Sequence, residues 1–279
     1  MTLDVIAAVL LGALLHALWN TLAKRNAGRA GDAVVVGILA GIPAALTLPF
    51  TPLPLANAWP QIFASAIIHV GYFKVLAGAY RGGDLSVAYP LMRGLPPLVV
   101  AASSILVFGE ALSLTAWGAM LMLIAGILVL GWDGLRAGAL TRSAARFVAI
   151  QIVIIVCYTL VDASGVRAAG NAWSYIAWMF ALTSVALLPV SRPSLRAIVN
   201  APRWHFFITL LGALCTLGSY GIALWAMTRA PVALVAALRE TSILFGAALG
   251  AWLLGERFGA TRWFAVFVVT CGVAAMRMV

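Results

Sequence analysis

The residues best suited to chemistry are five ionisable side chains that interrupt long apolar runs. They are Lys74, Arg93, Asp162, Arg239 and Glu240. A charge near the centre of a bilayer costs about 2.5–3.5 kcal/mol on insertion scales, so such a residue is a candidate functional group. Basic side chains can bind carboxylates or phosphates, and membrane carboxylates can relay protons. These residues therefore predict a site that binds a charged solute or moves a proton.

The two arginines lie at comparable depth in separate apolar runs. Arg93 is about two turns into its run, and Arg239 is eight residues into its own. Lys74 and Arg93 could instead extend their long stems to the membrane interface, but finding arginine at the same depth twice weakens that alternative. Glu240 follows Arg239 directly, and adjacent helical residues do not face each other. We therefore expect Glu240 to pair with a basic group on another helix.

Two polar stripes accompany these charges. His16 and Asn20 are four residues apart and share one helical face, with Trp19 beside them. Asp162 lies about 15 residues into a later run, one turn after Tyr158. A lone histidine in a membrane helix is often only a hydrogen-bonded packing residue. A stripe of His16, Asn20 and Lys24 at i, i+4 and i+8 on a helix of mostly Leu and Ala is less easily explained in that way, so we regard it as a candidate functional stripe.

The composition determines how these residues must be held. Of the 279 residues, 64% are hydrophobic and 9% are charged, and the mean hydropathy is +1.06. Soluble domains are about 45–50% apolar and 25% charged, so the composition argues against a soluble enzyme, a nucleic-acid-binding domain and a disordered chain. The net charge of +10 then indicates membrane orientation rather than a phosphate-binding surface. We expect an all-α, multi-pass protein of the cell (inner) membrane with no nucleic-acid partner.

Ten apolar runs are long enough to cross a bilayer, which needs about 20 residues per helix. They cover residues 3–23, 33–50, 59–80, 85–108, 114–131, 147–168, 172–190, 204–228, 231–254 and 261–278. The fourth run contains Tyr89-Pro90 and Pro96-Pro97 close to Arg93. These prolines predict a broken helix that exposes backbone groups to a solute, and an ordinary proline kink is the simpler alternative.

The two halves of the chain resemble each other. A shift of 146 residues aligns Arg93 with Arg239, Glu110 with Glu256, and Gly126 with Gly272. Ten of the 34 positions in 93–126 are identical to those in 239–272, against about 3 or 4 expected by chance. We therefore expect two five-helix repeats, 1–131 and 147–279, joined by a loop at 132–146. Five crossings in each half would make the repeats inverted, which is typical of carriers that rock around a central site.

Other residues are expected to be structural. Glu110 and Glu256 end the fourth and ninth runs in Gly-Glu steps, where capping or orienting a tight turn is the favoured role. Cys157, Cys215 and Cys271 lie in different apolar runs without paired spacing, which argues against a disulfide framework.

The basic residues are unequally divided between the two membrane faces. The odd-numbered connections carry 12 lysines and arginines, the other face carries 3, and 3 lie within the spans, which accounts for all 18. The positive-inside rule then places the odd connections in the cytoplasm and both termini outside.

Motifs for enzymatic chemistry are missing from the sequence. We find no HExxH, GxSxG, Walker A or GxGxxG pattern, and no carboxylate pair or histidine cluster arranged for metal-assisted chemistry. We therefore expect no enzymatic activity, no cofactor and no metal site.

Four stretches of the sequence resemble a known family. They are HALWNTLAKR at 16–25, GGDLSVAYPLMRG at 82–94, FGE at 108–110 and PVALVAALRETSILFGAALGAWLLGERFG at 231–259. They are similar to EamA-type transporters of the drug/metabolite transporter superfamily. The resemblance implies a central cavity lined by the first, third, fourth, sixth, eighth and ninth helices, with the fifth and tenth as scaffold. On this sequence the cavity would include His16, Trp19, Asn20, Tyr72, Lys74, Tyr89, Arg93, Tyr158, Asp162, Tyr220, Trp225, Arg239 and Glu240. Many members of the family have cytoplasmic termini, which is opposite to the charge count, so topology and transport direction stay open.

Together these features predict a secondary transporter of small polar or anionic metabolites that works by alternating access. The arginines would bind an anionic group, and Asp162, His16 or Glu240 would carry a coupling proton. Two alternatives are an exporter of cationic drugs and a membrane scaffold or lipid-handling protein that transports nothing. The expected partners are a small-molecule substrate and the lipid bilayer, and the protein would be a monomer or a homodimer.

Overall fold

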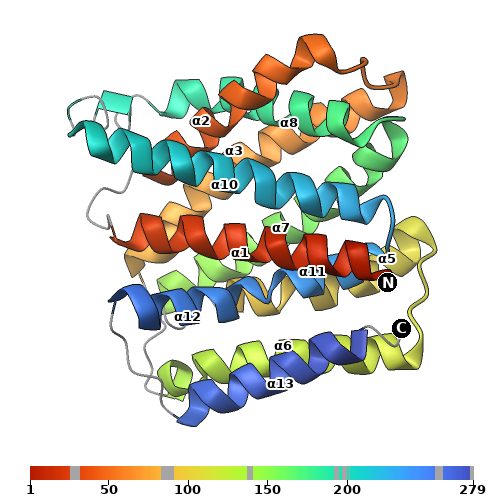
Figure 1. Cartoon of the computed structure of the whole chain (residues 1–279), viewed down its shortest axis with the longest axis vertical. Coiled ribbons are helices and arrows are strands. Elements are labelled where there is room, and N and C mark those ends of the chain that lie inside the picture. Colours follow the sequence, from red (N-terminus) through yellow and green to blue (C-terminus); the bar gives the residue numbers. More distant parts are fainter. Residues whose placement is uncertain are drawn as a thin grey trace.

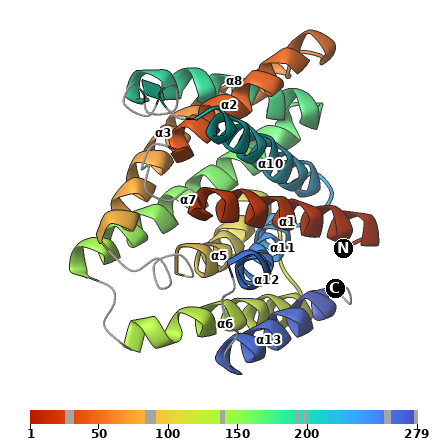
Figure 2. The ribbon, with the colours of Figure 1, turned by 60° about the vertical axis from the view of Figure 1, so that its left-hand side comes forward.

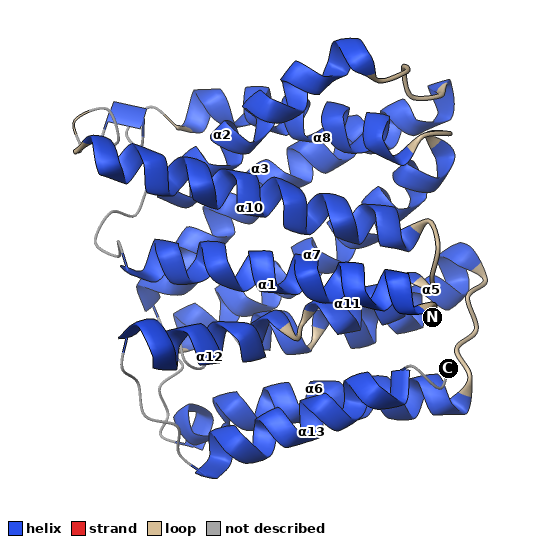
Figure 3. Cartoon of the chain, viewed as in Figure 1, coloured by secondary structure: helices blue, strands red, loops and turns tan. Residues whose placement is uncertain are grey.

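The structure is a computed structural model that describes residues 1–25, 32–82, 91–136, 141–191, 195–196, 200, 202–254 and 260–276. Throughout these residues the regular structure is helical and no strand occurs (Figure 3). The main helices are α1 (Leu3–Arg25), α2 (Asp32–Thr47), α3 (Trp59–Gly82), α5 (Pro96–Phe108), α6 (Leu114–Arg136), α7 (Arg142–Ala168), α8 (Ala172–Leu187), α10 (Arg203–Met227), α11 (Val232–Arg239), α12 (Ser242–Leu254) and α13 (Ala260–Met276). Short 3₁₀ turns are η1 (Leu48–Phe50), η2 (Ala56–Ala58) and η3 (Leu188–Val190). The prediction of an all-α membrane protein is confirmed.

Six described segments are long and apolar enough to cross a membrane, judged by length and composition. They are Leu3–Thr21, Ala33–Phe50, Leu91–Phe108, Ala145–Ala168, Ala172–Val190 and Arg203–Met227. Shorter apolar helices cover Leu114–Val129 and Trp263–Met276. Each of the ten runs predicted from the sequence contains helix in the described residues.

The fourth and ninth spans are both interrupted. Residues 91–94 are helical, Leu95 forms a bend, and α5 begins at Pro96. The two prolines at the start of α5 have no N–H to continue the backbone ladder, and the predicted break in this span is therefore present. The ninth span was predicted as one run, which is wrong: α11 ends at Arg239 and α12 begins at Ser242. The Thr241 hydroxyl donates to the Leu238 carbonyl (2.7 Å), an example of a side chain competing with the helical ladder.

The helices run side by side in layers (Figures 1 and 2). In Figure 1, α2 and α8 lie along the upper edge, α6 and α13 form a pair along the lower edge, and α1, α7 and α11 lie between them. The N- and C-terminal ends lie at the same end of the bundle (Figure 1), as an even number of crossings requires. We call this end the terminal face. On the opposite face α1, α3 and α8 end and α2, α7 and α10 begin.

The helix contacts follow a two-fold pattern. The principal pairs are α1–α10, α3–α7, α2–α8, α6–α13, α5–α11, α1–α12 and α5–α7. Exchanging the two halves turns α1–α10 into α7–α3 and α1–α12 into α7–α5, and leaves α2–α8 and α6–α13 unchanged. The division into two repeats stays a prediction, and this pattern supports it.

Two glycines show the same symmetry in atomic detail. A Cβ on Gly126 would lie 3.1 Å from the carbonyl oxygen of Ala265, and a Cβ on Gly272 would lie 3.1 Å from that of Ala119. Both glycines and both alanines are related by the 146-residue shift. The α6–α13 crossing therefore has equivalent close contacts on its two sides, each requiring a residue without a side chain.

Candidate functional site

A cavity of about 80 Å³ lies between the two halves of the chain. It is lined by His16, Trp19, Val36, Gly37, His69, Tyr72, Phe73, Arg93, Tyr158, Met179, Phe180, Thr183, Thr216, Tyr220 and Arg239. These residues come from α1, α2, α3, α7, α8, α10, α11 and the helical turn at 91–94. The cavity is displaced toward the opposite face, because Val36 lies four residues after the start of α2 and Thr183 four residues before the end of α8.

Arg93 and Glu240 form a buried ion pair that joins the two halves. The Arg93 Nε lies 2.8 Å from Glu240 Oε2, and the side chains are only 6% and 7% exposed. Arg93 precedes the break in the fourth span and Glu240 lies at the break in the ninth. A small second cavity of about 10 Å³ borders the same pair and includes Thr159. The expectation that Glu240 pairs with a basic group on another helix is confirmed.

Arg239 faces the cavity and lies against an aromatic ring rather than an acid. Its guanidinium carbon is 4.9 Å from the centroid of the Tyr220 ring, a distance at which a cation is attracted to the ring face. The residue is 7% exposed. In the part of the chain that the structure describes, Arg239 has no ion pair, because the neighbouring Glu240 binds Arg93. Its charge is therefore available to a ligand in the cavity.

Asp162 lies behind the cavity wall and binds two tyrosines. It accepts hydrogen bonds from the Tyr175 hydroxyl (2.8 Å) and from the Tyr220 hydroxyl (2.5 Å). Asp162 itself is fully buried. Gly165 makes room for this arrangement, since a Cβ there would lie 2.6 Å from the Tyr175 hydroxyl oxygen. Tyr220 thus connects Asp162 on one side to Arg239 on the other.

The cavity wall is largely aromatic. His69 stacks on Tyr158 with centroids 4.8 Å apart and an angle of 30°, and it meets Tyr220 edge-on at 5.9 Å. The His69 Nδ1 is 2.9 Å from the Ser65 carbonyl oxygen, which fixes the ring on α3. Tyr72 contacts Tyr158 edge-on at 5.9 Å. The wall can therefore bind a flat or apolar portion of a ligand whose anionic group reaches the arginines.

The structure brings together many of the predicted site residues. The cavity lining includes His16, Trp19, Tyr72, Arg93, Tyr158, Tyr220 and Arg239. Glu240 borders the smaller cavity, and Asp162 lies behind Tyr220. Asn20 donates to the His16 carbonyl instead of lining the cavity (2.7 Å). Whether any of these side chains binds a substrate stays a prediction.

Lys74 and Trp225 are not among the described residues that line this cavity. Lys74 is exposed, and Trp225 lies against the Arg229 guanidinium, 4.7 Å from its ring centroid. Tyr89 lies outside the described residues.

Several lining residues have no feature in the sequence that would identify them as part of a site. Val36 and Gly37 of α2, and Met179 and Phe180 of α8, are ordinary residues of apolar spans, and the family resemblance pointed to other helices. His69 is a further lining residue that is not among the predicted site residues. Its spacing of three from Tyr72 places both on one helical face, and this was the available signal.

Comparisons with known proteins agree with this architecture. The profile of the EamA-like transporter family matches residues 143–278. The spermidine export protein MdtI of Photorhabdus laumondii is 32% identical over 98 residues, which are 35% of this chain and 84% of that protein. The protein of the same name from Klebsiella pneumoniae strain 342 is 34% identical over 61 residues, 22% of this chain, and the match spans 56% of that protein's length.

A solved structure extends the likeness to the whole chain. A protein of known crystal structure superposes with a TM-score of 0.69 over 98% of this chain and 96% of its own. The two sequences are 20% identical, so this likeness shows the fold alone. The matching profile and the relative covered over most of its length show the family. The chain is an all-α, multi-pass membrane protein, and it belongs to the EamA-like transporter family of the drug/metabolite transporter superfamily.

Proposed function

We propose that the protein is a secondary transporter of small anionic metabolites, carboxylates in particular, and that it works by alternating access of two inverted repeats. The observation that carries the proposal is Arg239, a nearly buried arginine that faces the cavity and has no ion pair among the described residues.

The charges around the cavity favour an anion. Arg93 is balanced by Glu240, and Asp162 is occupied by two tyrosine hydroxyls. Arg239 is left with a ring face only. A carboxylate can accept two parallel hydrogen bonds from a guanidinium, and in a site shielded from water this interaction is stronger than at the surface. An anionic ligand would therefore complete the local charge balance.

The breaks in the fourth and ninth spans support the mechanism. Both breaks adjoin the cavity, and discontinuous helices at the repeat interface are typical of carriers that rock around a central site. The two-fold pattern of helix contacts supports the same interpretation.

Asp162 is the proposed site of the coupling proton. Within the described residues it is a fully buried carboxylate whose partners are hydroxyls rather than a basic group. A proton on Asp162 turns one acceptor oxygen into a donor. This disturbs the hydrogen bond from Tyr220, whose ring lies under Arg239, and so connects proton binding to the substrate site.

A ligand screen tests the substrate class. Purified protein is heated with amino acids, organic acids, nucleosides, spermidine and cationic dyes, and compounds that raise the melting temperature are tested for flux into proteoliposomes. We expect small carboxylates to be stabilising and to be transported down an imposed gradient. Flux of no compound across the panel would favour a scaffold or lipid-handling protein.

A cation exporter is the second candidate. The observation in its favour is the similarity to the proteins named spermidine export protein MdtI. Saturable flux of spermidine without flux of any carboxylate would support this candidate and overturn the anion proposal. Against it, the ionised groups that border the two cavities are two arginines and one glutamate.

A further inference from the structure

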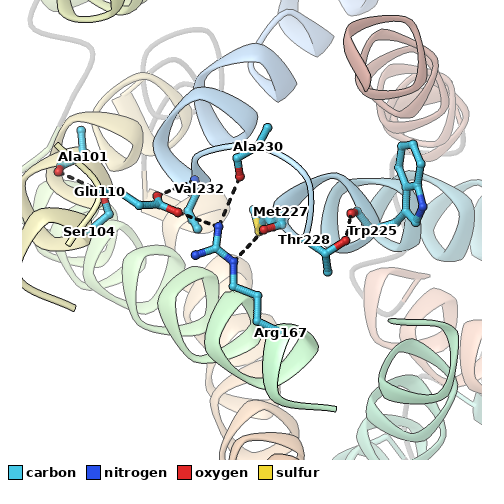
Figure 4. A network of polar contacts seen from close by, with 9 residues as sticks. All are labelled: Ala101, Ser104, Glu110, Arg167, Trp225, Met227, Thr228, Ala230 and Val232. Carbon is cyan, nitrogen blue, oxygen red and sulfur yellow. Dashed lines mark hydrogen bonds and ion pairs between the residues drawn. The ribbon is translucent and has the colours of Figure 1, made fainter. Parts of the chain in front are cut away.

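A second polar cluster lies at the terminal face, where α5, α7 and α10 end. Figure 4 shows its contacts. Arg167, near the end of α7, donates from Nη2 to Glu110 Oε1 (2.6 Å) and from Nε to the Met227 carbonyl (2.7 Å). The same Nη2 is 3.3 Å from the Ala230 carbonyl. Glu110 Oε2 accepts from the backbone N–H of Val232 (2.9 Å). We call Glu110 and Arg167, with these three backbone groups, the terminal clamp.

The clamp joins segments from both halves of the chain. Glu110 follows α5 in the first half, whereas Arg167 and the connection between α10 and α11 belong to the second. Gly109 positions the glutamate: its φ of +67° ends α5 in a left-handed turn, and its N–H donates to the Ile105 carbonyl. The Arg167 guanidinium also lies over the Phe108 ring, 4.9 Å from its centroid. The predicted turn-orienting role of Glu110 therefore describes only part of what this residue does.

Packed helix separates the clamp from the cavity. The cavity residue Tyr220 and the clamp residue Met227 are seven positions apart along α10, and Tyr158 and Arg167 are nine positions apart along α7. At 1.5 Å per residue this is about 10–14 Å. The cavity extends toward the opposite face, so the terminal face is the closed end in this structure.

We propose that the terminal clamp is the contact that closes the terminal face, and that it breaks and re-forms once in each transport cycle. This rests on the proposed alternating-access function. Glu110 and Arg167 are positioning residues in this cycle, because they control access without touching the substrate.

The exposure of the clamp suits a reversible contact. The Arg167 and Glu110 side chains are 30% and 17% exposed, so water can replace their partners when they separate, and exposed ion pairs add little net stability. The Arg93–Glu240 pair is 6% and 7% exposed, and separating it would leave uncompensated charges in the interior. The terminal clamp is therefore the contact between the halves that can open at lower cost.

Side-specific labelling tests the proposal. The native cysteines are replaced by serine, and a reporter is introduced in the cavity as Thr216→Cys. Vesicles of known orientation are then treated with a membrane-impermeant maleimide from either side. We expect Glu110→Gln, which keeps an acceptor for Val232 but loses the ion pair, to raise labelling from the terminal face several-fold while the melting temperature stays nearly constant. Arg167→Gln should act in the same direction.

The opposite result has a clear meaning. If both variants lower the melting temperature and leave the labelling ratio of the two faces unchanged, the clamp is a static structural contact and the proposal is wrong. The labelling experiment does not require a known substrate, so it tests the clamp independently of the proposed function. Failure of the proposed function would be seen in a different experiment, in which the unmodified protein transports no compound.

A cross-link provides the converse test. Cysteines at positions 110 and 167 are joined by a short, reducible bis-methanethiosulfonate linker, with Glu110→Cys alone as the control for modification. We expect the linked protein to lose transport and labelling from the terminal face, and to regain both on reduction. Transport at the unlinked rate in the linked protein would overturn the proposal.

Discussion

Arg93 and Arg239 share residue type and depth, and the 146-residue shift aligns them, yet their partners differ. Arg93 binds a carboxylate, and Arg239 lies over a tyrosine ring and faces the cavity. Two aligned positions therefore have different contacts. We assign ligand binding mainly to Arg239, and cohesion between the halves mainly to Arg93.

Substituting the two arginines separates these roles. We expect Arg239→Ala to abolish carboxylate transport while the protein still inserts and unfolds at nearly the same temperature, since the lost interaction with Tyr220 is worth about 0.5–2 kcal/mol. Arg93→Ala serves as the comparison. It leaves Glu240 buried without this partner and should destabilise the protein by about 3–5 kcal/mol. Uptake into proteoliposomes and thermal unfolding measure both effects. Unfolding caused by Arg239→Ala would assign Arg239 a structural role instead.

Asp162 is the residue at which proton coupling can be tested. Asparagine has nearly the same shape and can still bind both tyrosine hydroxyls, but it cannot take up a proton. We expect Asp162→Asn to keep substrate exchange between the two sides and to lose accumulation driven by a proton gradient. Exchange and gradient-driven uptake are measured on the same proteoliposomes. Full gradient-driven accumulation in this variant would place the coupling proton elsewhere.

At the scale of elements, the sequence predicted the spans well and their interruptions only partly. The break in the fourth span was visible because prolines lack the N–H that a helix needs. The break after Arg239 has no proline or glycine at that point. It depends on a threonine hydroxyl and on partners from other helices, and such tertiary contacts leave no local pattern.

The same reasoning explains which cavity helices were missed. Polar residues within apolar spans are conspicuous, so α1, α3, α7 and α11 could be selected by residue type, whereas α10 was indicated by the family resemblance. The contributions of α2 and α8 consist of apolar side chains, a glycine and Thr183. Nothing in their composition distinguishes a wall facing a cavity from one facing lipid.

The α6–α13 pair contributes no residue to the described cavity lining, as expected for a scaffold. We predict that Gly126→Ala and Gly272→Ala each destabilise the protein by about 1–3 kcal/mol, because each new methyl group meets the opposing backbone. Gly118→Ala on α6 is the matched control, since a Cβ there meets nothing within 4 Å. Thermal unfolding measures the three variants, and the folded fraction of each should transport at the normal rate. Equal stability of the Gly118 and Gly126 variants would contradict the close crossing.

At the scale of the whole molecule, the cavity and the terminal clamp lie toward opposite ends of one bundle, and the distribution of basic residues determines which end faces the cytoplasm. The opposite face carries 12 of the 18 lysines and arginines in its connections, which predicts that it is cytoplasmic and that both termini lie outside. In this orientation the cavity is displaced toward the cytoplasm, and the clamp closes the outer side. The structure would then represent the inward-facing half of the cycle.

Reporter fusions at the C-terminus decide the orientation. Alkaline phosphatase is active only outside the inner membrane. Green fluorescent protein fluoresces when it stays in the cytoplasm, and it does not fluoresce when the general secretion pathway carries it across the membrane. We expect the alkaline phosphatase fusion to be active and the green fluorescent protein fusion not to fluoresce. A bright fluorescent fusion with an inactive phosphatase would instead place both termini in the cytoplasm, as the family resemblance suggests. The labelling experiment on the clamp would still apply with the two sides exchanged, because in either orientation the cavity lies toward one face and the Glu110–Arg167 ion pair lies at the other.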